Sequence, residues 1–246
     1  MREISTGKYR ARLAHDAADL AQAMALRALV FRHGSIGPPD GDRFDTACDH
    51  VLIHNMASGT LVCCYRVMRL PQSSDFARSY SAQFYDLSRL AGFGGPMLEL
   101  GRFCVHPAHA DADILRLAWG ALAQMVDATG CTLLFGCSSF EGAQNPVHDP
   151  ALVQLRAVHL APDQWRPLRL APHIDDYAAR LAGHTPDLQA AIRAMPPLLR
   201  TYLAMGGWVS DHAVVDTDLD TLHVFTAVEI AKIPAARARA LRAIAG

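Results

Sequence analysis

Glu99 and Arg102 are the residues of this chain whose types and spacing best suit acid–base or anion-binding chemistry. They lie in a stretch, residues 97–107, that is rich in β-forming residues and ends at proline, so a strand is expected. Strict alternation would place the two side chains on opposite faces. A β-bulge with one extra residue at Gly101 places both on one face. That face then also holds Cys104 and His106, and the other holds Leu98, Leu100, Phe103 and Val105.

This pair of charged residues has two interpretations. Charges are common on the solvated face of a sheet, so Glu99 and Arg102 could form a structural ion pair. The alternative is a reactive site, because bulges recur beside active sites, where they redirect side chains and free backbone N–H groups. The bulge favours the second interpretation.

The composition is that of a globular domain without a nucleic-acid partner. The chain has 246 residues, 51% of them hydrophobic, and a formal net charge of -1, so no basic field is available to attract nucleic acid. Arginine supplies almost all the positive charge, since Lys8 and Lys232 are the only lysines. Guanidinium groups favour bidentate recognition of carboxylates and phosphates.

Cysteine and histidine patterns support neither disulfides nor a metal site. The six cysteines form no CxxC pair, so reduced, mostly buried thiols in a cytosolic protein are expected. The 12 histidines lack ligand spacing, and no metal is expected. No apolar run approaches the roughly 20 residues that span a bilayer, so any membrane role is expected to be peripheral.

Arg27 stands out on the first predicted helix, which follows Asp16 as N-cap and runs to about residue 32. It shares an apolar stripe with Met24 and Phe31. Either its stem packs while its head reaches solvent, or the head meets a carboxylate or an anion in a cleft.

Two carboxylates, Asp45 and Asp49, precede a predicted hairpin with strands at 50–55 and 60–70. They are either turn formers or ligands for a cationic group of a substrate. A loop over 34–42, rich in glycine and proline, comes before them and is long enough to fold over a site.

The rest of the chain predicts an α/β or α+β domain. A helix over 111–129 follows the bulged strand, and a buried strand over 131–137 follows the helix. No second domain is evident, so residues 1–246 are expected to form one domain. The remaining expected elements are a helical and loop excursion around 146–206, a helix over 198–205, a strand over 221–228 and a basic tail over 232–242.

Motifs for two common functions are missing. Ser138 lies near glycines, but not at the G-x-S-x-G spacing of a nucleophile elbow. No Walker loop or GxGxxG motif follows a strand, which disfavours nucleotide binding of those types.

From about residue 20 to 228 the chain resembles the bacterial ornithine-lipid N-acyltransferases. The matching segments are Ala25-Leu26-Arg27 through Phe31, Phe44-Asp45 with Cys48-Asp49-His50, Tyr65-Arg66, Glu99-Leu100-Gly101-Arg102 through Val105-His106-Pro107, and residues 134–137, 196–200 and 206–216. The resemblance implies a GNAT-type fold related to acyl-homoserine-lactone synthases, with a central mixed sheet, a bulged central strand and flanking helices. Members transfer a 3-hydroxyacyl chain from acyl carrier protein to the α-amine of ornithine, and a second, O-acylating enzyme then extends the lyso-lipid.

The resemblance and the chemistry of amide formation together suggest catalytic roles. An amine that attacks a thioester must lose a proton, so Glu99 is the expected base. A backbone N–H freed at Leu100 or Gly101 would stabilise the oxyanion. Arg102 would orient Glu99 or bind the carboxylate of the amino acid.

The resemblance also implies substrate-binding residues. Asp45 and Asp49 are expected to hold the cationic amino group. Arg27 would position the acidic loop or contact the pantetheine, and Phe31 is also expected to bind substrate. Arg66 and Arg69 both precede the same loop in similar settings, and Arg66 is preferred as the substrate-binding arginine.

Glycine is missing from the turn after the bulged strand, residues 108–113, which carries Asp111 and Asp113. Acyltransferases that bind coenzyme A commonly hold its pyrophosphate at this turn on backbone N–H groups. If the domain transfers acyl groups, the donor is therefore expected to be the phosphopantetheine arm of acyl carrier protein, with no bound cofactor.

Alternatives remain for the acceptor and for the class of protein. The loop after Phe31 is rich in proline and glycine where relatives often carry acidic residues, so glutamine or another amino acid is an alternative acceptor. An acyl-homoserine-lactone synthase and a non-catalytic acyl-chain-binding protein are the alternative classes. The protein is expected in the cytoplasm, peripheral at the inner membrane. Its basic tail would contact carrier protein or anionic lipid, or form a solvated helix end.

Overall fold

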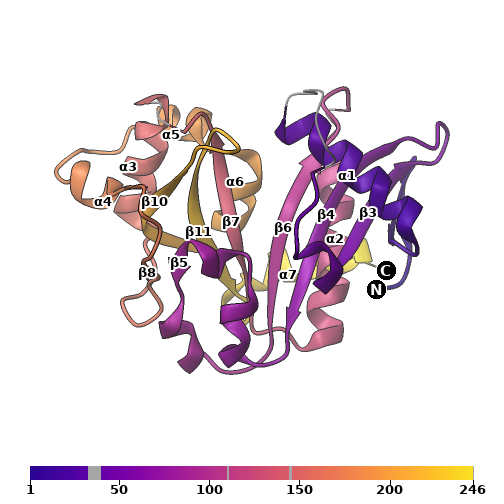
Figure 1. The fold of residues 1–246 in the computed structure, drawn as a ribbon, viewed down its shortest axis with the longest axis horizontal. Coiled ribbons are helices and arrows are strands. Elements are labelled where there is room, and N and C mark those ends of the chain that lie inside the picture. The colour runs from indigo at the N-terminus through magenta and orange to yellow at the C-terminus, as the bar shows by residue number, and fades with distance from the viewer. Residues whose placement is uncertain (33–39, 110, 144–145, 246) are drawn as a thin grey trace. The chain divides into compact units, whose positions relative to one another are not determined.

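The computed structural model describes residues 1–32, 40–109, 111–143 and 146–245, which form two compact units (Figure 1). The first unit contains residues 1–69, 98–131 and 234–246, and the second contains residues 70–97 and 132–233. All the candidate site residues lie in the first unit. The helical and loop excursion expected around 146–206 lies in the second.

The first unit is built on a sheet with a helix on each face. Its strands follow the order β1 (Ile4–Thr6), β2 (Tyr9–Leu13), β3 (Cys48–Asn55), β4 (Leu61–Leu70) and β6 (Met97–Val105). Helix α1 (Ala17–Phe31) covers one face, and α2 (Ala112–Thr129) covers the other (Figure 1). Successive residues of β4 point to opposite faces of the sheet. Cys64 Sγ lies 3.7 Å from the Ala23 carbonyl of α1, whereas the Tyr65 hydroxyl donates to the Ala118 carbonyl of α2.

The ends of both helices confirm the predicted caps. Asp16 accepts a hydrogen bond from the Asp19 N–H at 2.9 Å and begins α1. Asp111 begins α2 in the same way, and Gly130, with a φ of 62°, ends it.

Helix α7 (Ala235–Ala245) packs on α2 in the first unit. Gly120 permits this contact, because a Cβ there would lie 2.5 Å from Cγ2 of Ile244. Arg242 forms a bidentate ion pair with Asp127 at the end of α2, with both N–O distances 2.8 Å.

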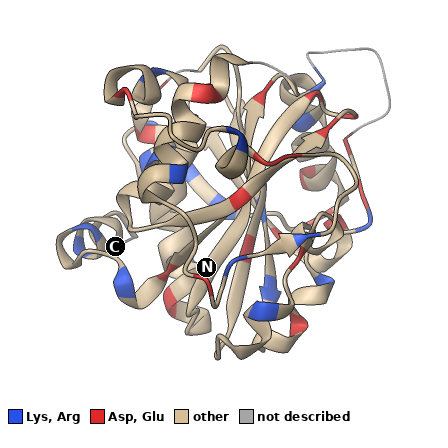
Figure 2. Cartoon of the chain, turned by 90° about the vertical axis from the view of Figure 1, so that its left-hand side faces the viewer, with Lys and Arg blue, Asp and Glu red and all other residues tan. Residues whose placement is uncertain are grey.

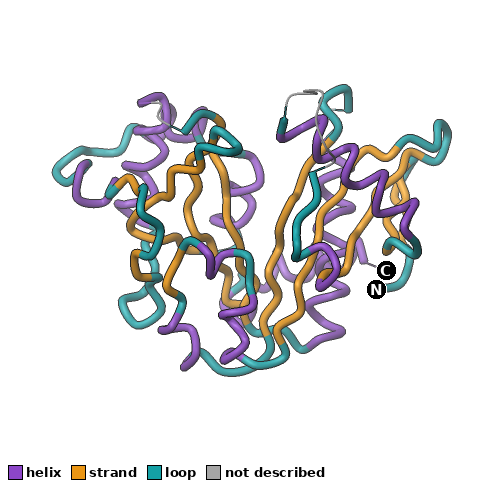
Figure 3. The backbone as a smooth tube through the Cα atoms, viewed as in Figure 1, coloured by secondary structure: helices purple, strands orange, loops and turns teal. Residues whose placement is uncertain are grey.

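The second unit contains an antiparallel sheet in the order β7-β11-β10-β9, and a separate two-stranded sheet, β5-β8 (Figure 3). These strands are β5 (Tyr85–Asp86), β7 (Leu133–Glu141), β8 (Leu168–Arg169), β9 (Ile174–Asp175), β10 (Trp208–Asp216) and β11 (Thr221–Glu229). The helices are α3 (Asp149–Val158), α4 (Tyr177–Arg180), α5 (Leu188–Ala194) and α6 (Pro197–Ala204). The sequence predicted α6, β11 and most of β7, but it did not predict β10.

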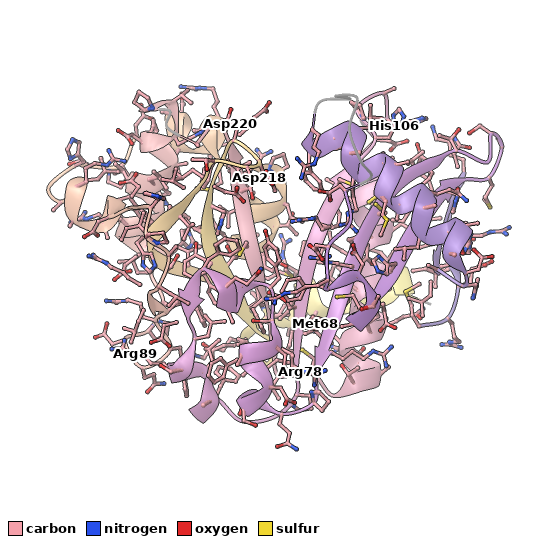
Figure 4. All side chains as sticks on the ribbon, in the orientation of Figure 1. Met68, Arg78, Arg89, His106, Asp218 and Asp220 are labelled. Atoms are coloured by element: carbon pink, nitrogen blue, oxygen red, sulfur yellow. The ribbon has the colours of Figure 1, made fainter. Side chains whose placement is uncertain are left out.

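The turn that joins β10 to β11 carries Asp218 and Asp220 (Figure 4). Asp220 has a φ of 47°, and its Oδ1 accepts a hydrogen bond from the Ala143 N–H at 3.0 Å. The turn thereby holds the chain where it leaves β7.

The described part of the chain contains no helix that is both long enough and apolar enough to cross a membrane. All six cysteines are free thiols, and Cys63, Cys64, Cys104 and Cys131 are buried.

Candidate active site

Strand β6 is bulged at Gly101 and Arg102, as the sequence predicted. Arg102 has a φ of 51°, which is rare for any residue except glycine. A Cβ on Gly101 would lie 3.5 Å from Nε of Arg66, and the side chain of Arg102 reaches the same face. Phe103 then turns to the α2 face, where its ring stacks on that of Tyr65 at 5.3 Å. Two successive residues on one face are the signature of a bulge.

The left-handed backbone of Arg102 predicts an unusual order of stability among variants. A Cβ in this conformation costs about 1 kcal/mol relative to glycine. We therefore expect Arg102→Gly to unfold at a higher urea concentration than Arg102→Ala, although both lose the same guanidinium contacts. Equal midpoints for the two variants would show that the backbone is unstrained there.

Glu99 is buried on the α1 face of β6, with 4% of its surface exposed. The pKa of the Cys48 thiol shows that Glu99 and Arg66 both act on this thiol electrostatically. Burial is the main cause that raises the pKa of Cys48 to about 12; nearby Arg66 opposes this shift, and the Glu99 carboxylate adds to it. Glu99 therefore lies within electrostatic reach of the start of β3 and shares this environment with Arg66.

Arg27 forms the centre of a buried ion-pair cluster. Its side chain is 1% exposed. Its Nε donates to Asp40 Oδ2 at 2.9 Å, and its Nη1 donates to Asp45 Oδ1 at 2.7 Å. Of the two interpretations of Arg27, the structure supports the one in which its head meets carboxylates.

Arg66 joins this cluster to the acidic segment before β3. Its Nη1 donates to Asp45 Oδ1 at 2.7 Å and to Asp42 Oδ1 at 2.6 Å, while Nη2 donates to Asp42 Oδ2 at 2.8 Å. Backbone contacts fix the segment further: the Asp42 N–H donates to Asp45 Oδ2 at 2.8 Å, and Nε2 of His50 lies 2.9 Å from the Asp45 carbonyl. The carboxylates are therefore held in position before any substrate binds.

Arg102 extends from the bulge to the same segment. Its Nε donates to Asp40 Oδ2 at 3.1 Å, and its Nη2 donates to Asp42 Oδ2 at 3.3 Å. The centre of its guanidinium group lies 6.0 Å from the centroid of the Phe31 ring. We define the Arg–Asp cluster as Arg27, Arg66, Arg102, Asp40, Asp42 and Asp45.

The Arg–Asp cluster lowers the pKa of Asp45. Burial alone would raise this pKa, but hydrogen bonds from Arg27, from the Asp42 backbone and from Arg66 outweigh burial and lower the pKa to about 2. Because the folded pKa lies below the unfolded value, the carboxylate stabilises the fold above about pH 4, and this stabilisation is lost as the pH falls towards 2.

This shift predicts a pH dependence of stability. Between about pH 4 and pH 2, the free energy of unfolding of the wild type should fall by about 2 kcal/mol more than that of Asp45→Asn. Urea unfolding of both proteins over this range measures the difference. Parallel pH profiles would contradict the assignment.

The structure brings together all but one of the predicted side chains. The exception is Asp49, whose Oδ2 accepts from Arg69 Nε at 2.6 Å on the exposed part of the first unit. Asp49 pairs with Val67 in the β3–β4 register, next to the pair His50 and Arg66, so it points to the opposite face from Arg66. The expectation that Asp49 lines the same site as Asp45 is therefore corrected. The preference for Arg66 over Arg69 as the site arginine agrees with their positions, because Arg66 contacts Asp45 and Arg69 contacts Asp49.

Sequence reasoning missed Asp40 and Asp42. They were assigned only to the loop over 34–42, of which residues 34–39 lie outside the described residues. Their signal was the spacing of three acids at 40, 42 and 45, directly before a strand that faces an arginine of the next strand. The roles of Leu100 and Gly101 as backbone donors stay predictions.

The start of α2 bears on the acyl donor. Asp111 accepts from the Asp113 N–H at 3.0 Å, and its other oxygen accepts from the Tyr9 hydroxyl at 2.9 Å. Lys8 Nζ lies 3.4 Å from the same Asp111 oxygen. A carboxylate thus already occupies the position where a helix N-terminus would bind a phosphate.

Known proteins share both the sequence and the fold. Residues 26–120 match the family model described as acetyltransferase (GNAT) domain. The L-ornithine Nα-acyltransferase of Rhodobacter capsulatus is 34% identical over 88% of this chain and 88% of its own length. The chain belongs to the family of the L-ornithine Nα-acyltransferases. The enzyme of that name from Brucella abortus is 32% identical over 92% of this chain and 86% of its own.

The fold of this family member also matches a solved structure. FeeM, an N-acyl amino acid synthase from uncultured soil microbes, superposes with a TM-score of 0.53 over 92% of this chain and 94% of its own, at 10% identity. The predicted GNAT-type α/β fold is thereby confirmed, and the chain is an acyltransferase by family.

Proposed function

We propose that this protein transfers a 3-hydroxyacyl chain from acyl carrier protein to the α-amine of L-ornithine, forming an amide. The product is the lyso-lipid that a second, O-acylating enzyme would complete. The observation that carries the proposal is the Arg–Asp cluster beside Glu99 on a bulged strand, in a chain of this family.

The exposed edge of the Arg–Asp cluster suits the zwitterionic end of an amino acid. Four members, Arg27, Arg66, Asp40 and Asp45, are buried, and their formal charges cancel. The other two side chains are more accessible, Asp42 at 23% and Arg102 at 14%. Asp42 would receive the ammonium group and Arg102 the carboxylate, because each offers the opposite charge at the accessible edge.

Glu99 would then act as the base. The substrate ammonium loses a proton to Glu99, the freed nitrogen lone pair attacks the thioester carbon, and the carbonyl oxygen becomes an oxyanion. Backbone N–H groups at Leu100 and Gly101 would stabilise that charge. Collapse of the intermediate breaks the C–S bond, and the departing pantetheine thiolate takes up the second proton that the nitrogen loses as the amide forms.

The donor would be the phosphopantetheine arm of acyl carrier protein, and no bound cofactor is required. The arm lacks the nucleotide of coenzyme A, so no pyrophosphate has to bind at the N-terminus of α2. The carboxylate of Asp111 at that N-terminus supports this choice of donor.

A basic helix near the C-terminus would contact the acidic carrier protein. Helix α7 carries several basic residues (Figure 2). Two of them, Arg237 and Arg239, are exposed. Arg242 is already paired with Asp127, so the first two arginines supply the attraction. We place the protein in the cytoplasm, peripheral at the inner membrane where its product accumulates.

Expression in a bacterium that makes no ornithine lipid tests the proposal. Mass spectrometry of extracted lipids should find N-(3-hydroxyacyl)ornithine with the wild type and far less of it with Glu99→Gln. If acylated glutamine is found, the acceptor is glutamine and not ornithine. If an acyl-homoserine lactone is found, the protein is a lactone synthase. If no acylated product forms with any carrier protein, the alternative of a non-catalytic acyl-chain-binding protein would be favoured.

A further inference from the structure

The second unit contains a cavity of about 350 Å³, bounded by helices α3 and α4 and by strands β9, β10 and β11. Small-molecule sites typically have volumes of roughly 300–1,000 Å³ and a mostly apolar lining. Six residues of this lining are apolar: Ala143, Pro146, Leu152, Ile174, Val215 and Leu222. Three are charged: Asp149, Asp175 and Arg180. The lining includes no residue of the candidate active site.

The cavity has an apolar floor and a charged mouth. Leu152 of α3 and Leu222 of β11 are buried, with 1% and 4% of their surfaces exposed, so they form the floor. The side chains of Asp149, Asp175 and Arg180, which we define as the charged trio, are 32%, 21% and 44% exposed. An elongated ligand would therefore place its apolar part on the two leucines and a polar group at the charged trio.

Arg180 of α4 holds the two carboxylates side by side. Its Nη1 and Nη2 donate to Asp149 Oδ2 and Oδ1 at 3.1 and 2.8 Å. Its Nε and Nη2 donate to Asp175 Oδ1 and Oδ2 at 2.9 and 2.6 Å. These contacts use most of the guanidinium N–H groups, whereas every carboxylate oxygen keeps a lone pair that Arg180 does not fill. The charged trio therefore offers a ligand mainly hydrogen-bond acceptors.

The charges at the mouth favour a cation. The charged trio contains two carboxylates and one guanidinium group, and the N-terminus of α3 adds only about half a positive charge beside Asp149. Asp220 contributes further negative charge, because its Oδ1 accepts from the N–H of the lining residue Ala143 at 3.0 Å. An anionic ligand would be repelled by these carboxylates.

We propose that this cavity binds a small molecule that carries a primary ammonium group on an aliphatic chain. The chain would pack on Leu152 and Leu222. The ammonium group would lie between Asp149 and Asp175, where its N–H donors match the free lone pairs of the carboxylates. The inference goes beyond the proposed function and does not depend on it, because the lining residues of the cavity take no part in the proposed transfer.

Two matched pairs of variants test the floor and the mouth separately. Val215→Phe fills the cavity from a half-buried position of β10. Val158→Phe makes the same change at a position of α3 that is 62% exposed and does not line the cavity. Asp175→Asn removes one carboxylate of the charged trio, whereas Asp163→Asn removes a carboxylate that is 90% exposed and lies outside the cavity.

Isothermal titration calorimetry of the full chain with n-octylammonium chloride tests the inference. The wild type should bind octylammonium saturably and at least about 10-fold more tightly than n-butylammonium, whose shorter chain buries fewer CH₂ groups. It should bind 1-octanol at least about 10-fold more weakly, because octanol has no charge, and should not bind octanoate. Val215→Phe should abolish binding of octylammonium, and Asp175→Asn should weaken it about fivefold or more. Both control variants should bind octylammonium as the wild type does.

The inference is wrong if the wild type shows no saturable binding of octylammonium, or if butylammonium, octanol or octanoate binds as tightly. It is also wrong if Val215→Phe unfolds cooperatively in urea, and is therefore folded, yet keeps the affinity of the wild type. If Val215→Phe does not fold, the two aspartate variants and the comparison of ligands on the wild type decide. These titrations do not measure acyl transfer, so a negative result leaves the proposed function unchanged.

Discussion

Replacing Glu99 by glutamine is expected to lower kcat/KM for amide formation by about 10²- to 10⁴-fold, the usual contribution of a positioned general base. Glutamine keeps the size and a hydrogen-bonding oxygen but cannot take the proton that the attacking ammonium must lose. The buried position of Glu99 beside the Arg–Asp cluster makes this carboxylate the best placed to do so. Steady-state kinetics with 3-hydroxyacyl carrier protein and ornithine measure the effect.

The pH profile separates the two roles that the sequence left open for Glu99. If Glu99 is the base, kcat/KM of the wild type falls on the acid side as the carboxylate is protonated, and Glu99→Gln lacks that decline. A slow variant that keeps the acid-side decline would show that Glu99 only positions Arg102. Glu141→Gln, the same change at an exposed position of a strand, should behave as the wild type.

Replacing Arg66 by methionine is expected to destabilise the fold by about 3–5 kcal/mol, the cost of removing one partner from a buried ion pair. The change leaves Asp45 without one of its donors and Asp42 without its bidentate partner, and Asp45 is buried. Urea or thermal unfolding gives the free energy of unfolding, and methionine fills a similar volume without charge.

Arg69 is the matched control on the same strand. Its side chain is 51% exposed and pairs with Asp49 at the surface. Arg69→Met should therefore change the free energy of unfolding by less than about 1 kcal/mol. Similar losses for both variants would mean that Arg66 is not a member of a buried network.

Part of this site could be predicted because successive side chains of a strand point to opposite faces of the sheet. The bulge at Gly101 followed from the sequence, because only an extra residue gives β6 a consistent apolar face. The same logic separates Arg66 from Arg69, since residues three apart in a strand face opposite ways. It also excludes Asp49 from the site, but only once the register of β3 against β4 is known.

Other parts of the site depend on tertiary contacts that local sequence does not encode. Asp40 and Asp42 are typical turn formers by composition, and their role comes from three arginines on α1, β4 and β6. Strand β10 was missed because successive residues, Trp208 to Ser210 and His212 to Val214, are buried, so it lacks the alternation that marks a half-buried strand.

Transfer of the acyl chain to the α-amine is tested most directly by a reaction of the purified protein with 3-hydroxyacyl carrier protein and L-ornithine labelled with ¹⁵N at the α position. One product is expected, in which the labelled nitrogen carries the acyl chain as an amide, together with release of free carrier-protein thiol. An amide at the unlabelled side-chain nitrogen, or no acylated ornithine while the same protein acylates another amine, would contradict this expectation.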